Sequence, residues 1–228
     1  MMRLAGLLIL ASLAFGCSVI TPPPLMPRHM GAAADPVGAV SATAIGGVAG
    51  GPWVNGSAGG EGRVMVQATP RLAVGAGIGG GSDVERRDAA GPHDLVAGRV
   101  FGRYGLDARG HFALDFGLGA GGMDNGLRYT TADLGFLASH TFAQRLTIYG
   151  GPTVALSMPV QAGDPVEDNN ELRAQRTTFA YGLTAGVGVK VIPNLVFSLE
   201  LLMLDARTQR DEAFIMSGTA GLRVTFGG

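Results

Sequence analysis

The sequence predicts an all-β protein built as an antiparallel up-and-down transmembrane β-barrel of about ten strands, with eight as the alternative count. First, apolar and polar residues alternate with a period of two from Gly38 onward. Second, only 15% of the residues are charged and 38 of the 228 are glycine, so both values lie far from those of an average chain. Third, the chain opens with an export signal and a proline-rich linker. We therefore expect a signal peptide over 1–16, a tether over 17–36 and a barrel over 37–228.

The export signal consists of a short basic region, Met1 to Arg3, and an uncharged apolar helix from Leu4 to Phe15. Gly16-Cys17 follows, and this pair resembles the end of a bacterial lipoprotein signal, whose cysteine becomes the lipidated N-terminus. The sequence departs from that pattern at Ala14, where leucine is typical, and at Phe15, where a small residue is typical. Cys17 is the single cysteine of the chain, and we expect lipid attachment there. The alternative is an ordinary signal peptide in which Cys17 is incidental.

The alternation is clearest near the C-terminus, where Phe214, Met216 and Leu222 fall on one face and Ser217, Thr219 and Arg223 on the other. Residues 195–204 also suit a helix, because Leu, Met and Glu favour helices and Pro193-Asn194 could start one. We favour a strand there, since strands are expected on both sides. The expected strands cover residues 40–48, 63–67, 72–78, 96–104, 112–118, 133–139, 146–158, 177–191, 195–204 and 214–226.

The connectors between these strands alternate in length, as is usual for barrels with short periplasmic turns and longer external loops. The short turns are expected at Thr69-Pro70, Asp107–Arg109, Ala143-Gln144 and Pro193-Asn194. The longer loops are expected at Gly50–Gly60, Gly80–Asp94, Gly121–Gly126, Pro159–Gln175 and Ala206–Glu212. An even strand count then leaves both chain ends on the periplasmic side.

A water-soluble barrel or sandwich would show the same alternation, so the composition of each face decides between the two. The polar face holds mainly Gly, Ala, Ser and Thr, which suits a narrow interior better than a wet surface. Aromatic residues on the apolar face form two bands, as expected at the two membrane interfaces. Trp53 is expected in the first external loop. The external band comprises Phe179, Tyr181 and Phe214, and the periplasmic band Tyr104, Phe112, Phe197 and Phe226.

Over Gly38 to Phe226 the chain resembles the small bacterial outer-membrane barrels of the OmpA-like and OmpW-like kind, in pattern and not in a specific motif. The resemblance implies a location in the outer membrane, with its lipids and the barrel-insertion machinery as partners. Members often end in an aromatic residue that this machinery reads. Here Phe226 has the expected alternating approach but is followed by Gly227-Gly228.

Eight charged residues are expected on the inward face, where a charge is costly unless it is paired. We expect Arg99 and Arg103 to pair with Asp115 and Asp133, and we expect Lys190, Glu200 and Arg223 to form a second cluster on three consecutive strands. Such clusters would plug the lumen, whereas the many inward glycines leave room for a narrow porin-like conduit. The eight residues are Arg63, Arg99, Arg103, Asp115, Asp133, Lys190, Glu200 and Arg223.

The function that these features favour is a structural or envelope-interaction barrel. The alternatives are the conduit and a rim enzyme like the ten-stranded omptin proteases, for which His93-Asp94, with Asp83 and Glu85 nearby, is the one candidate. We expect no enzyme activity, cofactor or metal, because no nucleophile or ligand motif is present. A net charge of −1 indicates no nucleic-acid partner. An envelope partner is unspecified, although the acidic loop Pro159–Gln175 is a candidate surface.

Overall fold

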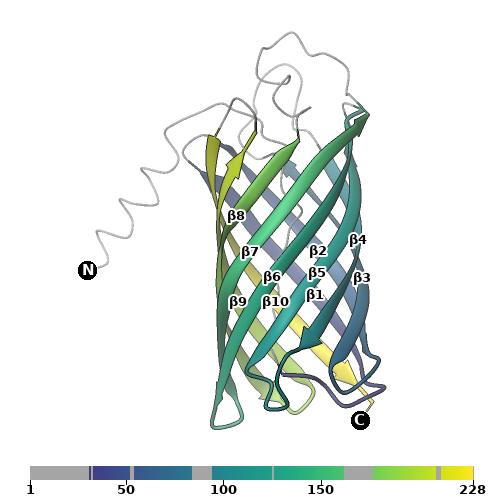
Figure 1. The fold of residues 1–228 in the computed structure, drawn as a ribbon, viewed down its shortest axis with the longest axis vertical. Helices are drawn as coiled ribbons and strands as arrows, with labels where there is room; N and C mark the ends of the chain where they lie inside the picture. The colour runs from purple at the N-terminus through teal and green to yellow at the C-terminus, as the bar shows by residue number, and fades with distance from the viewer. Residues whose placement is uncertain are drawn as a thin grey trace, which may run out of the picture.

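The computed structural model describes residues 31, 33–51, 54–83, 94–124, 126–161, 177–208 and 212–227, and the described part is a barrel of ten strands (Figure 1). Cys17, Trp53, Glu85 and His93 lie outside these residues. The strands are β1 Val40–Gly51, β2 Val54–Gln67, β3 Leu72–Asp83, β4 Asp94–Gly105, β5 Phe112–Met123, β6 Arg128–Phe142, β7 Leu146–Gln161, β8 Thr178–Ile192, β9 Leu195–Arg207 and β10 Glu212–Phe226.

The barrel is closed by pairing between its first and last strands. Every strand pairs antiparallel with its neighbours in sequence, and β1 pairs with both β2 and β10. Val40, for example, lies opposite Val66 on one side and Phe226 on the other. The up-and-down topology and the count of ten are therefore confirmed for the described residues, and the eight-strand alternative is wrong. Closure removes the unpaired sheet edge that a membrane could not satisfy.

Side chains alternate between an exposed apolar face and a buried inner face, and this alternation explains why these segments are strands. Ile78, Leu118 and Val160 are each more than 60% exposed, whereas Ser41, Thr153 and Ser198 are 2% exposed or less. The seven aromatic residues expected in the two bands all lie exposed on the outer face. Within the described segments there is no helix long and apolar enough to cross a membrane.

The segment that also suited a helix, residues 195–204, is strand β9. It is hydrogen-bonded along its length to β8 on one side and β10 on the other. The helix alternative is wrong because the period-two arrangement buries Ser198, Leu202 and Leu204 while exposing Leu199 and Leu201. Cross-strand pairing in a closed sheet overrides the helix propensity of Leu, Met and Glu.

All five expected long loops overlap strands at their bounds, since β7 runs to Gln161 and β9 to Arg207. In the other three, glycine-rich segments continue as strands. The predicted loop Gly50–Gly60 is wrong, since β1 runs to Gly51 and β2 begins at Val54. Likewise β3 continues through Gly80 to Asp83, and β5 continues to Met123. Glycine carries no side chain and so shows no alternation, but its backbone pairs normally: Gly47 lies opposite Gly59, and Gly59 opposite Gly81.

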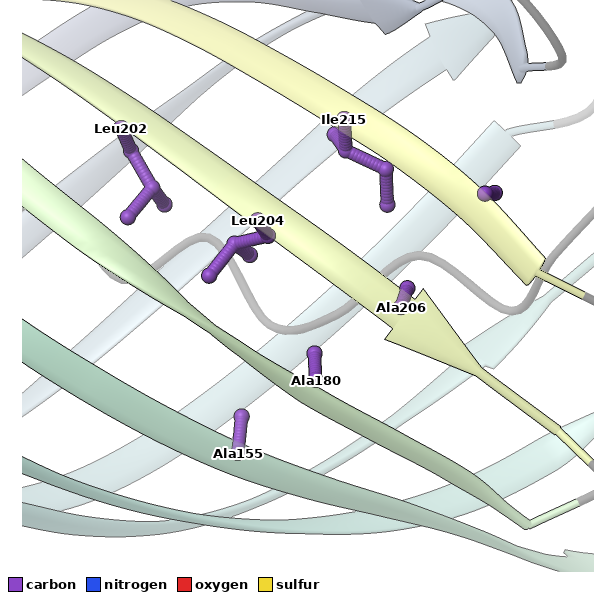
Figure 2. Packing of buried hydrophobic residues seen from close by; sticks show 7 residues of the cluster. Ala155, Ala180, Leu202, Leu204, Ala206 and Ile215 are labelled. Atoms are coloured by element: carbon purple, nitrogen blue, oxygen red, sulfur yellow. The ribbon is translucent and has the colours of Figure 1, made fainter.

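The four short turns are confirmed, and all lie at the end of the barrel where β1 begins and β10 ends (Figure 1). We call this the periplasmic end, because short turns characterise it in such barrels. Near the opposite, external end, apolar side chains of β7 to β10 form a buried cluster on the inner wall. Figure 2 shows Leu202 and Leu204 on β9 together with Ile215 on β10 and three small alanines, Ala155, Ala180 and Ala206. Sequence analysis did not foresee this inner apolar cluster.

Candidate functional site

The inner wall holds the candidate functional residues, and the first pair is formed by strands in direct contact. Arg103 on β4 lies opposite Asp115 on β5 in the strand register. The Arg103 guanidinium donates from Nε to Asp115 Oδ1 over 2.7 Å and from Nη2 to Oδ2 over 3.1 Å. Two bonds of this kind hold a guanidinium firmly. Arg103 is therefore fixed against the wall, as expected from the sequence.

The second pair joins strands that are not neighbours. Arg99 on β4 and Asp133 on β6 form an ion pair of 2.8 Å across β5. Gly117 on β5 lies between them, and a Cβ placed on it would lie 2.7 Å from Asp133 Oδ1 and would overlap the Arg99 guanidinium. The pair forms because Gly117 has no side chain to occupy the space between the two groups.

The third pair is formed within one strand. Arg63 and Glu61 are two residues apart on β2, so both side chains face inward, and their ion pair is 2.6 Å long. The sequence predicted an inward Arg63 but not Glu61, because the strand was expected to begin only at residue 63. The guanidinium carbons of Arg63 and Arg99 lie 5.4 and 5.5 Å from the centre of the Phe101 ring, a distance at which a cation is attracted to an aromatic face.

The fourth pair repeats the arrangement around Gly117 on the other side of the barrel. Tyr149 on β7 donates its hydroxyl to Glu200 Oε2 on β9 over 3.1 Å, across β8. Gly186 on β8 lies opposite both residues in the register. A Cβ there would lie 2.5 Å from Cε2 of the Tyr149 ring. Both side chains are buried, and Tyr149 was not among the predicted site residues.

The expected cluster of Lys190, Glu200 and Arg223 does not assemble as predicted. Lys190 on β8 and Arg223 on β10 lie on either side of Val196, which is four residues away from Glu200 on β9. Lys190 is exposed at the periplasmic end, and Arg223 contacts Asp35 Oδ2 at 3.4 Å. The prediction failed because it counted strands without their register. Asp35 was missed because it lies in the segment expected to be a tether.

Residue 31 and residues 33–36, which we call the strap, cross the periplasmic mouth of the barrel. Arg103 Nη1 donates to the carbonyl oxygen of Gly31 over 2.7 Å. A Cβ on Gly110, in the turn between β4 and β5, would lie 2.7 Å from Cα of Ala33. The strap thus contacts β4 through Gly31, the turn between β4 and β5 through Ala33, and β10 through Asp35. This part of the expected tether packs against the barrel.

Several of the inward glycines that suggested open space lie beneath longer side chains of other strands. A Cβ on Gly77 would lie 2.6 Å from Glu61 Oε1, and one on Gly121 would lie 2.6 Å from the Tyr129 ring. Between these side chains a cavity of about 30 Å³ remains, lined in part by Glu61, Arg99 and Tyr129. That volume suits about one water molecule.

The rim candidate for catalysis is only partly described, since His93 and Glu85 lie outside the described residues. The backbone N–H of Asp94 donates to Asp124 Oδ2 over 3.2 Å. His111 and His140 stack at the periplasmic end, with ring centres 6.0 Å apart. In the described part of the chain, no three His, Cys, Asp or Glu residues are grouped as metal ligands.

The two faces of the wall together define the class of protein. Large apolar side chains cover the outside, while arginines, carboxylates and hydroxyls line the inside. A water-soluble barrel has the opposite distribution, and soluble monomers rarely expose apolar surface on this scale. The chain is a transmembrane β-barrel.

Comparison with known proteins gives similarity in structure alone. No family model matches the chain, and no curated protein matches it. Solved structures that are similar include an outer membrane channel from Pseudomonas putida F1, with 11% identity, a TM-score of 0.49, and coverage of 89% of this chain and 100% of that one. The β domain of the Bordetella autotransporter BrkA has 13% identity, a TM-score of 0.48 and coverage of 83% and 99%. The Escherichia coli outer membrane protease OmpT has 12% identity, a TM-score of 0.44 and coverage of 83% and 94%.

Proposed function

We propose that this protein is a structural or interaction barrel of the outer membrane whose lumen is closed by its own side chains. The observation that carries the proposal is the pair of bridges across glycine, Arg99–Asp133 over Gly117 and Tyr149–Glu200 over Gly186. Each bridge uses the space that a glycine leaves on the inner wall. The alternative of a narrow conduit loses its main support, because side chains occupy the space above these glycines.

Closure extends along the barrel axis. The apolar cluster around Leu202, Leu204 and Ile215 covers the inner wall of β7 to β10 near the external end. The strap crosses the periplasmic mouth, where Arg103 holds the carbonyl group of Gly31. Buried ion pairs contribute little net stability. Stability therefore does not explain why the inner wall carries several of them, whereas closing the lumen does.

The test is single-channel recording of the full chain in planar bilayers. We expect conductance to be small or absent, because ions would have to displace paired charges. The double variant Arg99→Ala/Asp133→Ala removes one bridge and should raise conductance above that of the wild type. Ile148→Ala, which truncates an exposed residue of the outer face, is the control and should change nothing. Large, stable steps in the wild type would overturn the proposal.

A further inference from the structure

We propose that the periplasmic mouth of the barrel binds a small soluble oxyanion, a phosphate or a polycarboxylate, in a cationic cavity beside the strap. The cavity has a volume of about 540 Å³, within the range of roughly 300–1,000 Å³ that is typical of small-molecule sites. Among the described residues, Arg145, Lys190 and Arg223 line it together with one carboxylate, Asp35. These described side chains carry a formal surplus of two positive charges.

The three cations form an arc around the mouth because of the strand register. Lys190 on β8 and Arg223 on β10 lie opposite the same residue of β9, Val196. Arg145, in the turn before β7, is joined to Lys190 by a backbone hydrogen bond of 2.8 Å from the Lys190 N–H to the Arg145 carbonyl oxygen. Three positive charges from separate elements therefore face one space. A cleft lined by one sign of charge concentrates ions of the opposite sign.

These cations have unmet capacity for an anionic partner. The contact of Arg223 with Asp35 is 3.4 Å long, against the roughly 2.7–2.9 Å of a strong charge-assisted bond. Its Nε atom is buried and has no hydrogen-bond partner within the described residues. The side chains of Arg145 and Lys190 form no ion pair in the described part of the chain. An oxyanion in the cavity would supply acceptors to all three.

The chemistry of the lining indicates a soluble oxyanion. Guanidinium groups bind carboxylate and phosphate oxygens in a matching planar geometry. Hydroxyl and amide groups that also line the cavity would serve the remaining oxygens. The site lies at the mouth of the lumen, inside the ring of strands, and so faces the periplasm and not the lipid. The hydroxyl- and amide-bearing lining residues, apart from Tyr149, are Thr141, Gln144, Thr147, Asn194 and Thr225.

The test is calorimetric titration of the full-length, detergent-solubilised protein with inorganic phosphate and, separately, with citrate at low ionic strength. We expect saturable binding of at least one probe, weakened by added salt. Lys190→Gln should weaken it about fivefold, the effect of one charged contact. Asp35→Asn should strengthen it by about the same factor, because it removes the carboxylate that competes for Arg223.

The matched control is Arg109→Gln, which removes an exposed cation at the same end of the barrel that does not line the cavity. Heat-modifiable gel mobility establishes that each variant is folded. The proposal is overturned if neither probe shows saturable binding to the wild type. It is also overturned if Arg109→Gln weakens binding as much as Lys190→Gln, since the effect would then be one of net charge. Conductance is a separate measurement, so the oxyanion site and the closed lumen can fail independently.

Discussion

Tyr149 on β7 and Glu200 on β9 meet across an intervening strand, and Gly186 lies beneath their 3.1 Å hydrogen bond. Strands two apart in a sheet are separated by about 9.5 Å. Two long side chains can cover that distance along the wall only where the residue between them has no Cβ. Arg99 and Asp133 use Gly117 in the same way. Glycine on the inner wall therefore determines which polar residues of non-neighbouring strands can pair.

Adding a methyl group at either bridged glycine should destabilise the barrel. We expect Gly186→Ala and Gly117→Ala each to cost about 1–3 kcal/mol, the usual penalty for overpacking an interior. Urea unfolding of the refolded protein, followed by heat-modifiable gel mobility, measures the loss.

The control for the glycine variants is Gly218→Ala, in β10, where a Cβ would meet no atom within 4 Å. This variant should unfold at the same urea concentration as the wild type or slightly higher, because alanine restricts the unfolded chain. If Gly186→Ala and Gly218→Ala lost equal stability, the loss would come from the backbone of any strand glycine and not from the bridge.

Removing one partner of the Arg99–Asp133 ion pair should destabilise the barrel more than replacing both partners. Their side chains are 12% and 8% exposed, so Asp133→Ala leaves a buried guanidinium near Arg63 and should cost about 3–5 kcal/mol. The double variant Arg99→Met/Asp133→Leu should recover much of that loss. The same urea titration compares the single and double variants.

The exposed ion pair Arg207–Asp205, 2.9 Å long, is the control for the buried Arg99–Asp133 pair. Asp205→Ala should leave the unfolding midpoint nearly unchanged, because water and salt screen an exposed pair. A loss at Asp205 as large as that at Asp133 would contradict the distinction between buried and exposed charge.

The turn between β4 and β5 should depend on pH through Asp107. Its Oδ1 accepts the backbone N–H groups of Phe112 at 2.8 Å and His111 at 2.9 Å, and these bonds lower the pKa of the carboxyl below its usual 3.8. The ionised form thus stabilises the folded turn. This contribution is present above about pH 4 and disappears as the pH falls through the lowered pKa.

Amide exchange in this turn, measured against pH in Asp107→Ala and in the wild type, tests the effect. At neutral pH the variant should exchange faster at His111 and Phe112, and the difference should shrink as the wild-type carboxyl is protonated. Asp107→Asn retains an acceptor oxygen and should show no such pH dependence. A difference that is constant down to pH 2 would refute the assignment.

Lipid attachment at Cys17 remains a prediction from the signal sequence, since the residue lies outside the described part of the chain. Bacteria expressing the protein with labelled palmitate should incorporate label into the wild type and not into Cys17→Ser. Ser18→Ala retains the cysteine and should be labelled. An unlabelled wild type, with cleavage elsewhere, would indicate an ordinary signal peptide.

Much of the fold was predictable because alternation is a local property. Each of the ten expected segments lies within or overlaps one of the ten strands. The outward positions of Phe179, Phe197 and Phe214 follow from the period of two. The ends of the glycine-rich strands were not predictable, because residues such as Gly59 and Gly80 carry no side chain that could alternate.

The candidate site was predictable only in part. The sequence pattern placed Arg99, Arg103, Asp115 and Asp133 on one face, and they pair there. It also grouped Lys190 with Glu200, which the register separates. It had no means of finding Asp35 as a partner of Arg223, since these residues are 188 positions apart.

By itself the sequence determined the class of the protein and the face on which the alternating side chains lie. Both follow from the period of a single extended strand and from the polarity of its neighbours. Only the tertiary structure decided which charges pair. Pairing depends on register between strands and on which residue lies between two partners, as Gly186 does between Tyr149 and Glu200. The position of the strap across the mouth is also a tertiary property, since its contacts with Arg103 and Arg223 exist only once the barrel has closed.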